Sequence, residues 1–132
     1  MRYLTMVKMA EDIGPVPVEL VETMGAAMRE AFADGSMIDA GGLAGTADST
    51  EFRLRAGRVT ASDGPYAETK EVVGGYAIIE ARNDAEAVEA ARRVIEIHKE
   101  HWPGWEGAVE VRRIYEPEEG PPQGTLEEPS SA

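Results

Sequence analysis

The chain has 132 residues, of which 42% are hydrophobic and 29% are charged, a composition typical of one globular domain with one core. Its net charge of −12 disfavours nucleic-acid binding, because a negative surface repels phosphate backbones. No apolar run is long enough to span a bilayer and no secretion signal is recognisable, so we expect no membrane association and a cytoplasmic location. The absence of cysteine excludes disulfides and thiolate chemistry.

The first third of the chain predicts a strand followed by a helix. Residues 2–9 mix β-branched, aromatic and apolar side chains without helical spacing, which is typical of a central strand. Apolar residues then recur from Leu20 to Ala31 at the spacing of a helix with one buried face. Pro17 is suited to begin this helix, and Gly35 is suited to end it.

The middle of the chain predicts a short strand from Met37, an irregular stretch at 40–48 and then a β-hairpin. Alternating apolar residues predict a hairpin with one buried face and one wet face, and these residues are Phe52, Leu54, Ala56, Val59 and Ala61. The almost wholly apolar run 72–81 predicts a strand in the middle of the sheet. Gly74-Gly75 within it indicates a bulge or a close backbone approach.

A second helix and a last strand complete the pattern. Asn83 and Glu86 resemble a capping box at the start of a helix over 84–101. One face of this helix is expected to be buried, and it consists of Ala87, Val88, Ala91, Val94 and Ile95. Residues 108–115 predict the final strand.

The order of these elements predicts an α+β fold, with an antiparallel sheet that carries both helices on one face in the ferredoxin-like arrangement. The other face would be bare, so a two-fold homodimer is the expected assembly. We place the domain at residues 1–116. Residues 117–132 are rich in proline and glutamate and contain no lysine or arginine, which predicts a disordered acidic tail.

Residues 63–71 form the most distinctive motif, Asp-Gly-Pro-Tyr-Ala-Glu-Thr-Lys-Glu, and Val-Val-Gly-Gly-Tyr follows it. This run resembles the DGPF branch of the YCII-related family, whose typical motif differs only by phenylalanine at the position of Tyr66. The resemblance extends to the Arg-Tyr first strand, the Gly-Arg-Val hairpin and Val-Glu-Val-Arg in the last strand. It therefore covers nearly all of the chain before the tail.

The resemblance implies a ferredoxin-like fold and a homodimer whose sheets pack into a dimeric α/β-barrel. It does not imply one activity, since most members are uncharacterised. A few relatives in the wider family act on small organic molecules, and DGPF members often accompany extracytoplasmic-function sigma factors. A sigma-factor association is therefore one implied partnership, and a small-molecule ligand is another.

The motif also has a physical interpretation of its own. Asp63-Gly64-Pro65 is typical of a rigid turn, but a carboxylate held at the mouth of a sheet can also serve as a general base. An ion pair between Glu68 and Lys70 on the surface is one interpretation of the next residues. The other is a site for a small polar ligand, built from an aromatic face, acceptors and a cation, and its residues are Tyr66, Glu68, Thr69 and Lys70.

The only two histidines, His98 and His101, lie three residues apart near the end of the second helix. A histidine packed at the helix end is one interpretation, and an acid/base pair or two metal ligands is the other. The metal and any cofactor stay unknown, because no third ligand can be named. We assign Asp63 and His98 as candidate catalytic residues, and His101 and Trp102 as ligand-binding candidates.

Two functions follow from this sequence. The first is a YCII-related protein that binds a small polar organic molecule, with acid/base chemistry at the Asp63 loop. The alternative is a non-catalytic regulatory or interaction module, such as a partner of a sigma factor. An inward-facing Asp63 and His98 would favour the first, and an exposed apolar patch would favour the second.

Deletion of residues 117–132 should leave the melting temperature nearly unchanged, because this segment cannot bury enough apolar surface to dock on the domain. Thermal unfolding of the shortened and the full chain, followed by circular dichroism, measures this. A drop of many degrees would show that the tail packs against the domain.

Overall fold

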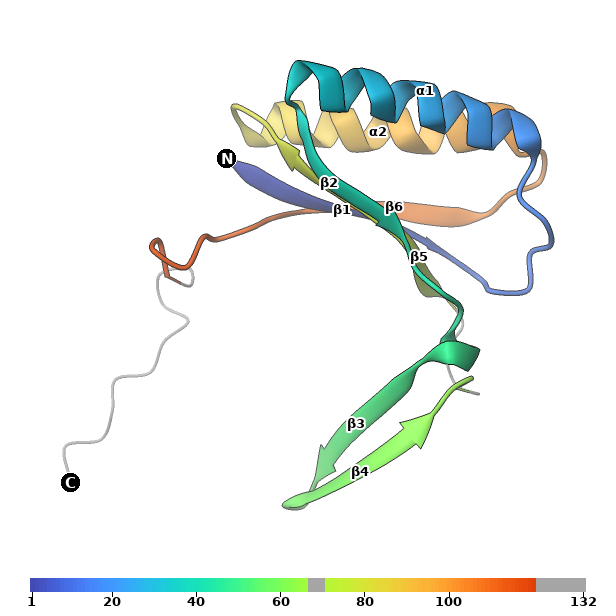
Figure 1. Ribbon diagram of the computed structural model, residues 1–132, viewed down its shortest axis with the longest axis vertical. Coiled ribbons are helices and arrows are strands. Elements are labelled where there is room, and N and C mark those ends of the chain that lie inside the picture. The colour runs from blue at the N-terminus through green and yellow to red at the C-terminus, as the bar shows by residue number, and fades with distance from the viewer. Residues whose placement is uncertain (67–70, 121–132) are drawn as a thin grey trace.

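Two helices lie on one face of a four-stranded antiparallel sheet, and a separate hairpin projects from it (Figure 1). The computed structural model describes residues 1–66 and 71–120. In chain order the elements are β1 (Arg2–Met9), α1 (Val18–Asp34), β2 (Met37–Gly42), the 3-10 turn η1 (Thr46–Asp48), β3 (Thr50–Arg55), β4 (Arg58–Asp63), β5 (Val72–Glu80), α2 (Asp84–His101) and β6 (Gly107–Arg113). The predicted α+β class is confirmed.

The main sheet has the strand order β2-β5-β1-β6, which is the ferredoxin-like arrangement of two β-α-β units. The sequence correctly predicted a central β1 and a mid-sheet β5. The register jumps from the pair Val7–Gly75 to the pair Lys8–Val73, so Gly74 is the extra residue of a β-bulge. The bulge predicted at Gly74-Gly75 is therefore confirmed.

Both helices begin and end where their local signals place them. Pro17 is the N-cap of α1, and Gly35 ends the helix in the left-handed region, at φ 84°, with its N–H bonded to the Phe32 carbonyl. Asn83 caps α2 by accepting a hydrogen bond of 2.9 Å from the Glu86 N–H. The Glu86 carboxylate, however, bonds to Arg82, so only half of the predicted capping box forms.

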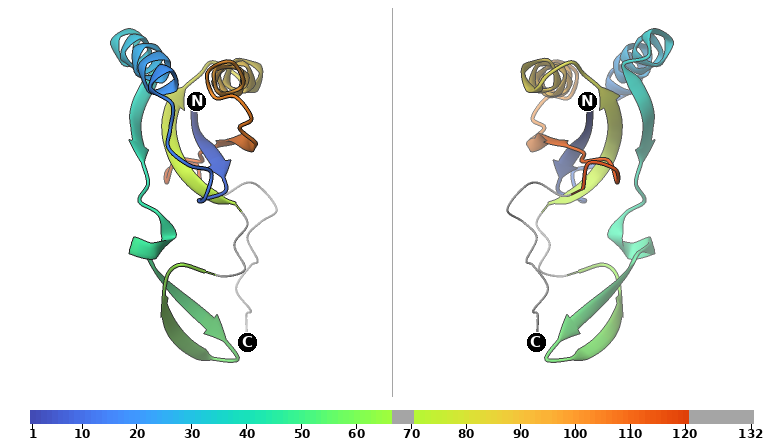
Figure 2. Two further views of the ribbon diagram at one scale, coloured as in Figure 1. Left: turned by 90° about the vertical axis from the view of Figure 1, so that its right-hand side faces the viewer. Right: turned by 90° about the vertical axis from the view of Figure 1, so that its left-hand side faces the viewer.

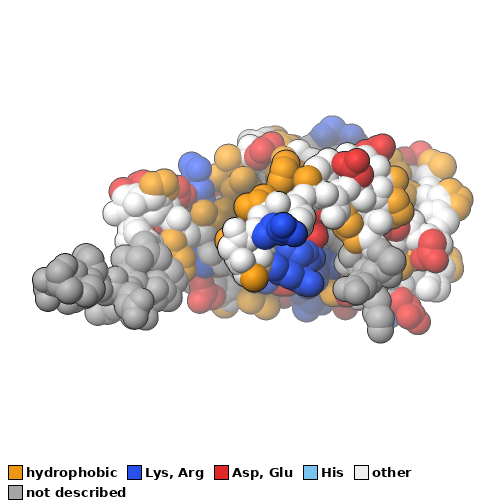
Figure 3. All heavy atoms as spheres, turned by 90° about the horizontal axis from the view of Figure 1, so that it is seen from below, with side chains coloured by type: hydrophobic (Ala, Val, Ile, Leu, Met, Phe, Trp, Pro, Cys, Tyr) orange, Lys and Arg blue, Asp and Glu red, His pale blue; other side chains and the backbone are white. Residues whose placement is uncertain are grey.

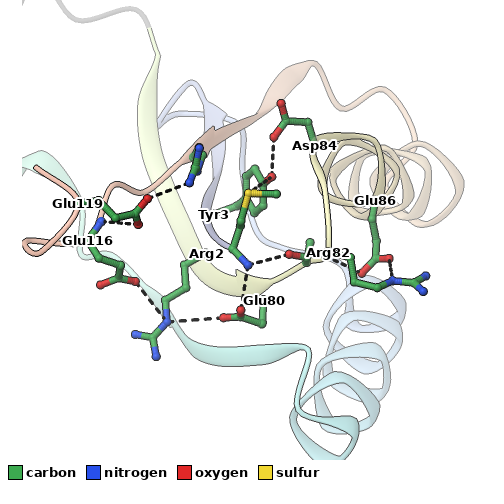
Figure 4. A network of polar contacts seen from close by, with 11 residues as sticks. Arg2, Tyr3, Glu80, Arg82, Asp84, Glu86, Glu116 and Glu119 are labelled. Atoms are coloured by element: carbon green, nitrogen blue, oxygen red, sulfur yellow. Dashed lines mark hydrogen bonds and ion pairs between the residues drawn. The ribbon is translucent and has the colours of Figure 1, made fainter. Parts of the chain in front are cut away.

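The core lies between β1, β5 and α2, where Tyr3, Ile79, Ala81 and Ala87 form a buried cluster. The Tyr3 hydroxyl donates a 2.5 Å hydrogen bond to Asp84 at the start of α2 (Figure 4), and this bond raises the pKa of the phenol. The bond fixes the start of α2 over the central strand.

The predicted buried face of α2 is only partly correct. Ala87, Ala91 and His98 are buried, but Val88 is 56% exposed. Ala87 lies on the helix face that packs onto the sheet. Val88 is the next residue along the helix, so its side chain is rotated away from the sheet. A helical wheel with its apolar face rotated slightly would have placed Ala87 inside and Val88 outside.

Surface ion pairs join the two ends of the described chain to the sheet (Figure 4). The terminal ammonium of Met1 donates to Glu80 at 3.0 Å and to the Ala81 carbonyl at 2.9 Å. Residues 117–120 belong to a turn in which Glu119 pairs with Arg113 at 2.9 Å. The rest of the predicted tail, residues 121–132, lies outside the described residues.

No helix or strand of residues 1–66 and 71–120 covers the face of the sheet opposite the helices (Figure 2). Because side chains alternate along a strand, and Tyr3 faces α2, Leu4 and Met6 face the open side. Their partners on β5 are Ile78 and Tyr76. All four are only half-buried, and we call them the open-face apolar strip.

The hairpin β3–β4, residues 50–63, forms an arm that extends from the sheet on the side away from the helices (Figures 1 and 2). Its two-residue loop, Ala56-Gly57, has positive φ at both positions, 48° and 76°, as a type I′ turn requires. The predicted buried face of this hairpin is wrong for the single chain, since Phe52, Leu54 and Val59 are all at least 65% exposed. Alternation reveals that a face is apolar, but it does not supply the element that covers it.

Candidate functional site

The Asp63 motif lies at the base of the arm, where β4 ends. An Oδ1 oxygen of Asp63 accepts a 3.1 Å hydrogen bond from the hydroxyl of Thr50, its cross-strand partner at the first residue of β3. This bond closes the open end of the hairpin. The first role visible for Asp63 is therefore structural.

Gly64 makes the closest approach in the motif. Its N–H donates to the Ser49 carbonyl at 2.9 Å, and a Cβ at this position would lie 1.6 Å from the Thr46 carbonyl oxygen. No side chain fits at that distance. Glycine is thus required because two backbone segments touch, whereas the sequence had indicated only a turn.

Tyr66 extends the same cluster. The Ser49 hydroxyl donates to the Thr46 carbonyl at 2.7 Å, so the Tyr66 hydroxyl, 3.0 Å away, is the donor to Ser49. Tyr66 therefore uses its polar end within the chain. We call this cluster the polar hub, and its residues are Glu11, Thr46, Ser49, Gly64 and Tyr66.

Glu11 completes the polar hub from the loop between β1 and α1. Its carboxylate accepts hydrogen bonds from the Thr46 hydroxyl and from the Thr46 N–H, the latter at 2.7 Å. These bonds, the hydroxyl first, hold the pKa of Glu11 below its usual value. Sequence reasoning missed Glu11, Thr46 and Ser49, because contacts across this separation in the chain leave no local pattern.

A second cluster gathers at the C-terminal end of α2. His98 is 5% exposed, and its Nδ1 lies 2.8 Å from the Val94 carbonyl. A carbonyl only accepts, so Nδ1 carries a proton and donates this hydrogen bond. The ring also contacts Trp105, with centroids 4.7 Å apart, and Trp105 lies 6.3 Å from Trp102.

A cavity of about 320 Å³ opens beside these rings, and we call it the tryptophan cavity. Its lining includes Trp102, Trp105, Ile95, Lys99 and Glu106. The indole Nε1 of Trp105 is buried and has no hydrogen-bond acceptor among the described residues. An unpaired buried donor costs about 1–3 kcal/mol, so this indole N–H lowers the stability of the helix end.

His101 lies outside this arrangement. Its ring nitrogens are 3.9 Å from the carboxylates of Glu19 and Glu100, at ion-pair distance only if the ring is protonated. Across residues 1–66 and 71–120, no three histidine, aspartate or glutamate side chains are grouped to hold a metal ion. The two histidines are therefore used differently despite their helical spacing.

The predicted site residues thus separate into two groups. Trp102 and His98 meet at the tryptophan cavity, and Asp63 and Tyr66 meet at the base of the arm. No hydrogen bond joins Asp63 to His98 within the described part of one chain. The remaining ligand-binding candidates, Glu68, Thr69 and Lys70, lie outside the described residues.

The fold and the two clusters define a ferredoxin-like α+β domain with a polar hub at the end of its hairpin and an aromatic cavity beneath its second helix. Residues 1–117 match the family model of the YCII-related domain, and the chain belongs to that family. A search of curated proteins found no match. Neither described helix is long and apolar enough to cross a membrane.

Substitution of Gly64 by alanine should lower the free energy of unfolding by about 2 kcal/mol or more, because the new methyl group would overlap the Thr46 carbonyl. Urea unfolding measures the loss. Gly42→Ala is the matched control, since a Cβ there would meet nothing closer than 3.9 Å. Equal stability of the two variants would contradict the proposed contact.

Substitution of Glu11 by glutamine should lower the melting temperature by a few degrees near neutral pH. Because the pKa of Glu11 is lowered in the folded state, its contribution is present above the ordinary pKa and is lost as the pH falls through the folded value. The difference from the parent protein should therefore shrink as the pH is lowered below the ordinary pKa of a glutamate, about 4.3. Asp12→Asn, in the same loop, controls for the general loss of a carboxylate, and a difference that persists in acid would refute the assignment.

Proposed function

We propose that this protein binds a small polar organic molecule in the tryptophan cavity. The observation that carries the proposal is a cavity of about 320 Å³ whose lining combines two indole rings, Trp102 and Trp105, with the Lys99 ammonium. Sites for small molecules combine apolar walls with a few placed polar groups, and this cavity has that composition.

The side chains around the cavity indicate the class of ligand. The indole rings of Trp102 and Trp105 offer flat apolar surfaces, and the Lys99 ammonium offers a partner for one carboxylate. Glu106, on the same lining, repels a second negative charge. A planar monocarboxylate fits this combination best.

The acid/base role of Asp63 and His98 stays a prediction from the sequence. In this chain the Asp63 carboxylate bonds to Thr50, and the protonated nitrogen of His98 bonds to Val94. Binding is therefore the function that the geometry supports best. The buried imidazole supports it indirectly, because its ring packs against Trp105.

A homodimer of the DGPF type belongs to the same proposal. The open-face apolar strip supports it, since Leu4, Met6, Tyr76 and Ile78 line a sheet face that no element of this chain covers in the described residues. Packing two such faces together would remove apolar surface from water on both copies.

An interaction module is the second candidate function, as a regulator that docks on another protein such as a sigma factor. The exposed apolar side of the arm favours it, because Phe52 is 73% and Leu54 is 68% exposed. Apolar groups gathered on a surface are typical of protein contacts.

Ligand binding can be tested by intrinsic fluorescence, because the chain has two tryptophans and both line the cavity. Benzoate serves as the probe, and we expect it to change the emission of the parent protein. Lys99→Met should weaken its binding by about tenfold or more, since a charge-assisted hydrogen bond is lost.

Arg93→Met is the matched control, because it removes a cation from the exposed surface of α2 outside the cavity lining. Its affinity for benzoate should equal that of the parent protein. Unchanged emission of the parent at millimolar benzoate, or equal losses in both variants, would refute a monocarboxylate site in this cavity.

A further inference from the structure

A second cavity, of about 230 Å³, lies between the start of α2 and the end of β6, and we call it the Asp84 cavity. Its lining comes from β1, α2 and β6, and consists of Tyr3, Asp84, Ala87, Val88, Val111 and Arg113. None of these residues lines the tryptophan cavity, which lies at the other end of α2. The two cavities are therefore separate sites.

The register of the sheet explains why these residues meet. Tyr3 on β1 pairs with Arg113 on β6, and the side chains of paired residues lie on the same face of a sheet. Val111 precedes Arg113 by two residues, so it shares that face. Because Tyr3 reaches Asp84 on α2, this is the face that the helices cover. The beginning of α2 closes the cavity from that side.

Asp84 supplies an anion whose position is fixed. The hydroxyl of Tyr3, a residue only 3% exposed, donates to one oxygen of Asp84 at 2.5 Å, and Figure 4 shows the two side chains turned toward each other. The other oxygen accepts no hydrogen bond from residues 1–66 and 71–120. Figure 3 shows acidic side chains in several separate places on the surface, so carboxylates as such are common here. Asp84 differs in lining a cavity while a buried phenol holds it.

Arg113 supplies a cation to the same cavity. One of its N–H groups donates to Glu119 at 2.9 Å, and its guanidinium carbon lies 4.8 Å from the centre of the Tyr115 ring. This stacking restrains the plane of the guanidinium, which carries several further N–H donors. The contact with Glu119 also shows that a carboxylate can reach this group. Arg113 is therefore suited to bind the carboxylate of a ligand.

The remaining walls of the Asp84 cavity are apolar. Ala87, Val88 and Val111 contribute only hydrocarbon side chains to it. Val88 is 56% exposed, so it borders the opening, and a bound apolar group would remove its surface from water. The cavity thus combines one anion, one cation and a small hydrocarbon surface.

We propose that the Asp84 cavity binds a free amino acid with a small branched side chain. Its ammonium contacts Asp84, its carboxylate contacts Arg113, and its side chain packs on Val88. A ligand with only a positive charge is repelled by Arg113, and one with only a negative charge is repelled by Asp84. A zwitterion satisfies both groups. This inference goes beyond the ligand of the tryptophan cavity and does not depend on it.

The test is a titration of the 15N-labelled full chain with L-valine, followed by two-dimensional NMR. Saturable shifts are expected for the backbone amides of Ala87, Val88 and Val111. Valinamide lacks the carboxylate and isovalerate lacks the ammonium, so each should bind about tenfold more weakly or worse, because one charge-assisted hydrogen bond is lost.

Three variants assign the carboxylate contact. Arg113→Met should weaken the binding of valine by about tenfold but should not weaken that of valinamide. Arg112→Met is the matched control, because its neighbouring side chain lies on the other face of the sheet and pairs with Glu110. Glu119→Gln removes the ion pair with Arg113 but keeps the guanidinium, so it should bind valine at least as tightly as the parent protein.

Four outcomes would overturn the proposal. They are an absence of saturable shifts at tens of millimolar valine, equal binding of valine and isovalerate, equal losses in the Arg113 and Arg112 variants, and shifts confined to the tryptophan cavity. The benzoate affinity of Arg113→Met should equal that of the parent protein. The two sites can therefore succeed or fail separately.

Discussion

The helices cover only one face of the β2-β5-β1-β6 sheet, and the remaining architecture depends on this one-sided burial. The buried cluster under α2 is small, because among the described residues it holds Tyr3 and Ile79 beside two alanines. The Tyr3–Asp84 hydrogen bond fixes the helix over that core, and the central strand β1 pairs on both sides. The apolar surface that the helices do not reach, on the open sheet face and on the arm, is not covered by any other described residues.

Local signals predicted most of the elements, because their causes are local. Asn83 caps α2, Gly35 ends α1, and Gly74 is the bulge in β5. The hairpin was predicted correctly as a hairpin, but its surroundings were not, since the alternation of Phe52 and Leu54 records only that one face is apolar. The covering element has to come from elsewhere in the fold or from another molecule, and no spacing in the sequence encodes that choice.

The candidate site could also be predicted only in part from local sequence patterns. The Asp63 motif was recognisable as a unit, yet its hydrogen bonds go to Thr50 and Ser49, and its closest contact is with Thr46. These partners come from residues 46–50, which run from the 3-10 turn into the first residue of β3, and contacts of this kind depend on tertiary structure. The tryptophan cavity was easier to anticipate, because His98, Trp102 and Trp105 follow one another around the end of a single helix.

Charge connects the arm with the rest of the molecule. Two bodies that each carry a large negative charge repel, so apolar burial alone must overcome this repulsion before they associate. The arm differs in sign from the rest of the chain, because residues 50–63 hold three arginines and two carboxylates. Arg55 and Arg58 raise the free energy of an isolated hairpin and lower it once carboxylates lie opposite. The same pair therefore disfavours an arm left in solvent and favours contact with an acidic surface.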